Sequence, residues 1–149
     1  MFVFIREVQM SNSDLMRDYF KNTEYTFNEG IDDYGCVFFC SHPIVLDAGN
    51  NITLVFQFGK DEKVLDIKIF NIATIESPLK REELLKLTNE LNITYRFGKF
   101  VVNSQGDIVM EETIAAFEDF NPKEVVEVGY IMARSVNESY EKFMKLRWL

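Results

Sequence analysis

The 149-residue sequence predicts a single α+β domain in which helices pack on an antiparallel sheet. Residues 51–60 and 63–72 each alternate apolar and polar side chains, which is typical of two strands that pair as an antiparallel hairpin. Further strands are separated from this hairpin by helical segments, without the β-α-β alternation of a parallel sheet. The expected order of elements along the chain is therefore α-β-β-β-β-α-β-β-α.

The N-terminal part begins with an apolar run at residues 2–5, which is too short to span a membrane. Residues 1–9 are expected to form an extra strand or a loosely held leader, because Ser11 can cap a short helix that starts just after them. Strands are expected from Tyr25 and over residues 35–41. Both faces of the second of these strands are apolar, so we expect it to be central in the sheet and covered on both sides.

A second helix is predicted to begin at Ser77 and Pro78, since serine caps helices and proline suits their first position. Its apolar stripe would be Leu84, Leu87, Thr88 and Leu91. Asn92 lies where this helix must stop, and asparagine tolerates the left-handed conformation that ends many helices. Asn89 is expected to hydrogen-bond to free carbonyls or to the following strand. A ligand-binding role for Asn89 and Asn92 is the alternative.

The C-terminal part predicts two strands, over residues 95–102 and 107–114, joined by a hairpin turn at residues 104–107. Asn121 and Pro122 then start a long helix, the first as its cap and the second at its first position. The expected core stripe of this helix is Val125, Val128, Met132, Val136, Tyr140 and Phe143.

Four segments of this half of the chain form a recognisable set: the helix ELLKLTNELN, the strand YRFGKFVV, the hairpin strand GDIVMEETI and the helix NPKEVVEVGYIMARSVNESYEKF. Taken together, they resemble the YbjN family, also called bacterial sensory transduction regulator-like proteins. The resemblance covers residues 78–147 well and the earlier strands weakly. It implies a fold like that of type III secretion chaperones, a domain that often pairs with itself, and a regulatory or chaperone-like role. It implies no catalytic motif.

The net charge and the few histidine and cysteine residues argue against several classes of function. A net charge of -8 disfavours binding to nucleic acids and to anionic membrane surfaces. The only histidine, His42, shares a strand face with Cys36 and Cys40, and three ligands along one straight strand are too far apart to meet around a metal. We therefore expect no enzyme activity, no metal and no cofactor. The two cysteines, expected to be buried and unpaired, fit a cytoplasmic protein.

Protein binding is the function that these observations leave. Tyr95, Arg96 and Phe97 place large side chains on both faces of one expected strand, and arginine and aromatic residues are enriched at interfaces. The C-terminal helix either covers this strand or leaves one face open for a partner. Trp148 either folds back on the core or anchors a partner, and we expect it to be covered. The predicted function is a non-catalytic protein-binding module that acts as a homodimer; the alternative is a small-ligand sensor with an apolar pocket between helix and sheet.

Overall fold

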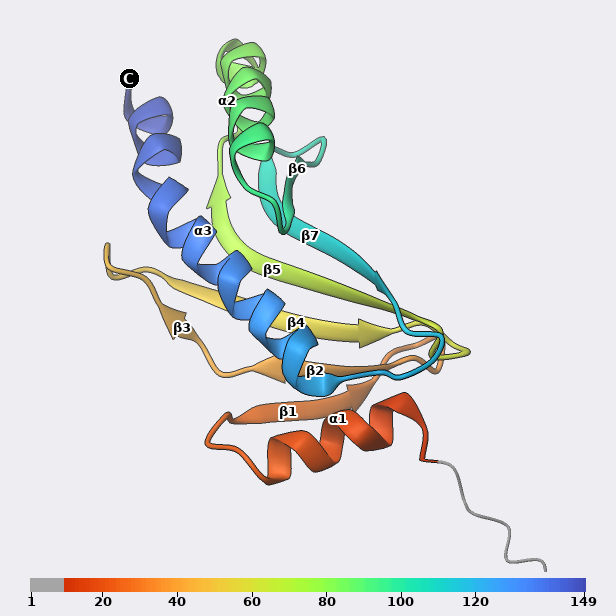
Figure 1. Ribbon diagram of the computed structural model, residues 1–149. Helices are drawn as coiled ribbons and strands as arrows, with labels where there is room; N and C mark the ends of the chain where they lie inside the picture. The colour runs from red at the N-terminus through yellow and green to blue at the C-terminus, as the bar shows by residue number, and fades with distance from the viewer. Residues whose placement is uncertain (1–9) are drawn as a thin grey trace, which may run out of the picture.

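The computed structural model describes residues 10–149, so the expectation for residues 1–9 lies outside the described part (Figure 1). It confirms the α+β class and the expected order of the longer elements. The short strand β3 and the 3-10 helix η1 were not expected. The elements are α1 (Asn12–Lys21), β1 (Phe27–Ile31), β2 (Val37–Ser41), β3 (Ile44–Val45), β4 (Asn51–Phe58), β5 (Val64–Thr74), η1 (Pro78–Lys80), α2 (Arg81–Thr94), β6 (Lys99–Val102), β7 (Asp107–Ala115) and α3 (Pro122–Trp148).

The strands form one antiparallel sheet in the order β1-β2-β4-β5-β7-β6, and β3 pairs with β4 beside this path. The α-helices α1, α2 and α3 lie on the same face of the sheet (Figure 1). The ring of Phe20 in α1 lies 5.4 Å from that of Phe39 in β2 and 6.3 Å from that of Phe56 in β4. At the other end of the sheet, Phe143 of α3 meets Phe100 of β6 edge to face at 5.2 Å. These aromatic contacts join the helices and the sheet into one core.

The expected hairpin of β4 and β5 is present, and the face with the longer apolar side chains is the buried one. Among residues 10–149, no helix lies on the opposite face of the sheet (Figure 1). Phe38 and Cys40 of β2 point to that open face and are half-buried, so the prediction that β2 is covered on both sides is wrong. The physical reason is Gly30 in the neighbouring strand. A Cβ atom on Gly30 would lie 2.4 Å from the Phe38 ring, so the missing side chain leaves room for the ring to lie flat on β1.

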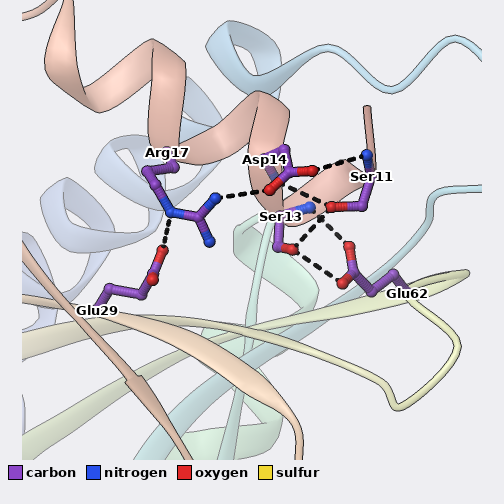
Figure 2. A network of polar contacts seen from close by, with 6 residues as sticks. All are labelled: Ser11, Ser13, Asp14, Arg17, Glu29 and Glu62. Carbon is purple, nitrogen blue, oxygen red and sulfur yellow. Dashed lines mark hydrogen bonds and ion pairs between the residues drawn. The ribbon is translucent and has the colours of Figure 1, made fainter. Parts of the chain in front are cut away.

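A network of polar contacts fixes the first helix to the sheet (Figure 2). Ser11 caps α1 by accepting a hydrogen bond from the Asp14 N–H, and the Asp14 carboxylate accepts one from the Ser11 N–H. The Glu62 carboxylate, in the turn between β4 and β5, accepts hydrogen bonds from the Ser13 N–H at 2.7 Å and the Ser13 hydroxyl at 2.8 Å. A negative charge at a helix N-terminus stabilises the helix, so the turn both holds and stabilises α1.

Arg17 joins this network to the first strand (Figure 2). Its guanidinium donates to Asp14 at 2.6 Å and to Glu29 of β1 at 2.7 Å. The hydrogen bonds to Glu29 and Asp14 raise the pKa of Arg17, and the one from Arg17 contributes most to lowering the pKa of Asp14. The expected first helix is therefore confirmed, and its polar face is bound to β1.

The last helix crosses the sheet and continues beside α2 (Figure 1). The side chain of Asn121 caps it by accepting from the Lys123 N–H at 3.1 Å. Gly129 lets α3 approach the sheet closely, because a Cβ atom there would lie 2.7 Å from the Phe56 ring. Of the expected core stripe, Val125, Met132, Val136 and Phe143 are buried, and Val128 and Tyr140 are half-buried.

Candidate protein-binding surface

Asn92 lies inside α2 rather than at its end, because the helix continues to Thr94. The prediction of a left-handed Asn92 is therefore wrong; the left-handed position is taken by Gly98, with φ of 84°. The Asn92 side-chain amide donates to the Phe100 carbonyl at 3.1 Å and accepts from the Phe100 N–H at 2.7 Å. It satisfies both backbone groups with which another strand would pair, so Asn92 closes the β6 edge of the sheet.

The segment Tyr95–Gly98 is a loop and not the start of a strand, since β6 begins only at Lys99. The Gly98 N–H donates to the Glu112 carboxylate at 2.7 Å. The Lys99 ammonium donates to the carbonyls of Asn92 and Tyr95, both at 2.8 Å, and so supplies a positive charge at the C-terminus of α2. These contacts hold the loop in one conformation.

The three expected interface residues of this loop have different environments. The Tyr95 hydroxyl donates to Glu138 of α3 at 3.1 Å, and the ring is half-buried. Arg96 is exposed, and Phe97 is 41% exposed. The helices therefore hold Tyr95, while Arg96 and Phe97 point outward from a loop that is fixed on both sides.

The outer face of α2, which precedes this loop, also carries exposed apolar side chains. Leu85 is 46% exposed and Ile93 is 77% exposed. Asn89 lies between them, one helical turn from each, and is exposed as well. Within residues 10–149 its side chain has no hydrogen bond, and the expected bonds to carbonyls or to β6 are made by other groups. We call Leu85, Asn89, Ile93, Arg96 and Phe97 the α2 surface.

The sequence contained a signal for Leu85 and Ile93 that we did not use. They are spaced eight residues apart around Asn89, on a different face from the buried Leu84 and Leu91. Two large apolar residues outside the core stripe of a helix indicate a surface that binds something.

Trp148 is 75% exposed, so the prediction that it is covered is wrong. Its ring contacts the Arg147 guanidinium, which lies 5.2 Å from the ring centroid. The Arg147 carbonyl accepts a hydrogen bond from Lys80 at the start of α2. Tyr95 at the other end of α2 contacts Glu138, about 15 Å further down α3 at 1.5 Å per residue. Trp148 and the Tyr95–Phe97 loop are thus at opposite ends of α2 and do not form one patch.

A groove lined by phenylalanines lies between α1 and β1. It has a volume of about 280 Å³, and Phe20, Phe27 and Phe39 form its apolar wall. Arg17 and Lys21 lie at its rim. A pocket between helix and sheet is therefore present, but its lining residues do not include Asn89 or Asn92.

The residues considered for chemistry are dispersed. His42 is exposed, while Cys36 and Cys40 are half-buried and not fully buried as expected. Burial raises the pKa of the Cys40 thiol, which lowers its reactivity. Across residues 10–149, no three His, Cys, Asp or Glu side chains are close enough to hold a metal ion. In the same range, no helix has both the length and the apolar character that crossing a membrane requires.

Comparison with known protein families gives a match over most of the chain. Residues 12–143 match the model of the YbjN family, whose description is "Putative bacterial sensory transduction regulator". No curated protein matches the chain. The description names a regulator and no reaction, which is compatible with a non-catalytic, regulatory role. The match covers nearly the whole chain, including α1, the sheet and most of α3. The chain therefore belongs to the YbjN family.

Proposed function

We propose that this protein is a non-catalytic regulatory module that binds another protein chain through the α2 surface. The observation that carries the proposal is the combination of exposed apolar side chains on α2 with an outward Arg96 and Phe97 on a fixed loop. Burying Ile93 and Phe97 in a contact removes apolar area from water. A loop that is already ordered loses little conformational entropy on binding, which favours affinity.

The composition of the chain favours a protein partner and a cytoplasmic location. The acidic surface, with a net charge of -8, opposes binding to nucleic acids and anionic membranes and favours a protein partner. Two unpaired thiols suit the reducing cytoplasm, where we place the protein. We propose that it acts there as a homodimer. Likeness to type III secretion chaperones, and a chaperone-like role, stay predictions.

The test of the α2 surface is capture of partners from a lysate of the native host by the tagged full-length chain, read by mass spectrometry. Ile93→Ser and Phe97→Ser remove apolar area from the surface. Ile31→Ser is the matched control, because Ile31 is 69% exposed but lies on β1. We expect a partner that the wild type and Ile31→Ser retain and that both α2-surface variants lose. A partner retained equally by all four proteins would refute the assignment of this surface.

A small-ligand sensor is the second candidate, and the groove between α1 and β1 supports it. Its apolar wall of Phe20, Phe27 and Phe39 suits a small apolar ligand. Its volume of about 280 Å³ lies just below the usual range of roughly 300–1,000 Å³ for ligand pockets, so a ligand would have to be small. A thermal-shift screen of small apolar carboxylates tests it, with Phe27→Ser as the variant that should abolish any shift. If the groove binds the ligand, the thermal shift should be unchanged in Ile93→Ser and Phe97→Ser.

A further inference from the structure

We propose that the outer edge of β1 binds an extended segment of another protein, which adds a strand to the sheet and places one large apolar side chain in the groove between α1 and β1. This site is separate from the α2 surface, and the mode of binding is different, because backbone pairing supplies part of the affinity. Three features support it: the free backbone groups of the edge, the groove beside them, and a positive charge at the rim of the groove.

The backbone of β1 has hydrogen-bonding groups that point away from the sheet. Just after β1, the Asp32 N–H donates to the Cys36 carbonyl at 2.9 Å, so these two residues form a hydrogen-bonded pair. Hydrogen-bonded and non-hydrogen-bonded pairs alternate along antiparallel strands, so the N–H and C=O groups of Phe27, Glu29 and Ile31 face outward. Among residues 10–149, no backbone or side-chain group bonds to them. They form the row of donors and acceptors with which a further strand pairs.

The two edges of the sheet differ in this respect. At β6, the Asn92 amide already bonds to both backbone groups of Phe100. At β1, no side chain among residues 10–149 has this role, and Asn28, Glu29 and Ile31 are exposed. The β1 edge is therefore the one to which an extended chain can be added.

The groove between α1 and β1 lies directly beside this edge. Phe27 and Glu29 of β1 line it on one side, and Phe20 lines it from α1. Side chains alternate between the two faces along a strand, so every second side chain of an added strand would point to the face on which the groove lies. The groove volume of about 280 Å³ is about twice that of a cavity of roughly 150 Å³ that binds benzene. It therefore fits a single large apolar side chain, such as phenylalanine, leucine or tryptophan.

The groove is ordered before anything binds. The rings of Phe20 and Phe27 stack with their centroids 4.2 Å apart. The Arg17 guanidinium donates to the Glu29 carboxylate at 2.7 Å, which fixes α1 to β1 (Figure 2). A groove that is already formed loses little conformational entropy when a side chain enters it.

The rim of the groove carries a positive charge that is available to a partner. Lys21 lines the groove and makes no ion pair with any of residues 10–149. The Glu29 carboxylate also lies there, but it is paired with Arg17. Asp18 and Glu24, three residues before and after Lys21, do not line the groove. We therefore expect the bound segment to carry an acidic residue two positions from its large apolar residue, on the same face of the added strand.

The test is hydrogen exchange of the full-length chain, followed by NMR. In the free protein, the amides of Phe27, Glu29 and Ile31 should exchange rapidly, whereas those of Asn28 and Gly30, which bond to β2, should exchange slowly. The probe is a peptide selected against the full-length chain from a phage-displayed library of random linear peptides. When this peptide binds, the three outward amides should become protected, because they then pair with the peptide backbone.

Proline at position 31 tests the backbone pairing directly. Ile31→Pro removes one outward N–H and leaves the bonds to β2 intact, and an edge strand tolerates proline at such a position. Ile31→Ser is the matched control, since it removes the same side chain and keeps the N–H. We expect the peptide to bind Ile31→Pro at least about tenfold more weakly than the wild type, and Ile31→Ser within about twofold. Lys21→Glu should weaken binding by about two- to fivefold, as expected for an exposed ion pair.

Protection of the three outward amides in the free chain would overturn the inference, because the edge would already be paired. So would a library that yields no binding peptide, a selected peptide that leaves these amides unprotected, or equal binding to Ile31→Pro and Ile31→Ser. Protection is measured in the wild type, so this result does not depend on how well Ile31→Pro folds. A small apolar ligand that needs only the groove would bind Ile31→Pro and Ile31→Ser alike.

This test and that of the α2 surface can fail separately. Ile93→Ser and Phe97→Ser leave the β1 edge unchanged, so the selected peptide should bind both variants as well as it binds the wild type. Capture of a partner that these two variants lose would support the α2 surface even if no peptide bound to β1. Protection of the β1 amides by the peptide would likewise stand if the capture experiment failed.

Discussion

Replacement of Asn92 by alanine tests how the sheet edge at β6 is closed. In the wild type, one side-chain amide makes two hydrogen bonds to the backbone of Phe100, at 2.7 Å and 3.1 Å. Phe100 is buried, so water replaces these bonds poorly when the amide is removed. The Asn92→Ala variant therefore loses both bonds and leaves a donor and an acceptor unsatisfied.

The expected cost follows from these two bonds. Each hydrogen bond contributes about 0.5–1.5 kcal/mol, and the better helix propensity of alanine returns about 0.5 kcal/mol. We expect Asn92→Ala to lower the free energy of unfolding by about 0.5–2.5 kcal/mol. For a chain of this size, a loss of about 2 kcal/mol lowers the Tm by about 4–8 °C.

The matched control is Asn89→Ala, which makes the same replacement in the same helix at an exposed position without hydrogen bonds. Only the propensity gain applies there, so we expect no loss of stability. Both variants are compared by urea unfolding followed by far-UV circular dichroism, at the same protein concentration so that any dimerisation is treated alike in both. If Asn92→Ala is as stable as Asn89→Ala, the reasoning about the sheet edge is wrong.

Three further outcomes are expected. Gly98→Ala should lower the Tm, since it puts a Cβ atom 2.8 Å from the Met110 sulfur at a φ of 84°; an unchanged Tm would show that the loop adapts without strain. A hydrogen bond from Thr74 contributes most to lowering the pKa of Asp107 in the folded protein. The ionised Asp107 therefore stabilises the fold fully above the ordinary carboxyl pKa near 4, and this stabilisation is lost as the pH falls through the lower pKa of the folded protein. Urea unfolding between pH 6 and pH 2.5, about the range of that loss, should show that the free energy of unfolding depends less on pH in Asp107→Asn than in the wild type. Identical pH dependence in the two proteins would contradict this role of Asp107. Burial should make Cys40 react more slowly with a disulfide reagent at pH 8 than free cysteine does, whereas equal rates would mean that the thiol is accessible.

Much of the fold could be predicted from local patterns. The alternation in residues 51–60 and 63–72 determines which face of β4 and β5 is buried, because a one-residue shift would expose every apolar side chain. The caps at Ser11 and Asn121 likewise mark the starts of α1 and α3. These signals depend on neighbours in sequence, which a sequence displays directly.

The errors concern residues whose role depends on distant partners. The apolar residues of β2 indicated two covered faces, but Gly30 on another strand gives Phe38 a place on the open face. Asn92 has the right type and place for a helix end, yet its amide meets the Phe100 backbone eight residues later. No local sequence pattern predicts these contacts, because each depends on a residue of another element that lies beside the side chain only in the folded structure.

The candidate site was predicted only in part. Arg96 and Phe97 are exposed as an interface requires, although they lie in a loop and not on a strand. Ile93 was missed, because the helix was expected to stop at Asn92 and therefore not to include Ile93, whereas it continues to Thr94. Trp148 was expected to be covered, and nothing in its neighbouring residues reveals that α3 extends beyond the sheet.

The separation along the chain between α3 and the strands that it covers affects how the protein is made. The apolar face of β4 and β5 is complete by Thr74, but Phe143 follows 69 residues later. At about 5–20 residues per second, a nascent chain waits about 3–14 s for the helix that covers this face. During that time the face is open to molecular chaperones and to other nascent chains. A ribosome that stalled before Pro122 would leave a product without the helix that packs across β4 and β5, so truncated chains should be cleared by proteases or should aggregate.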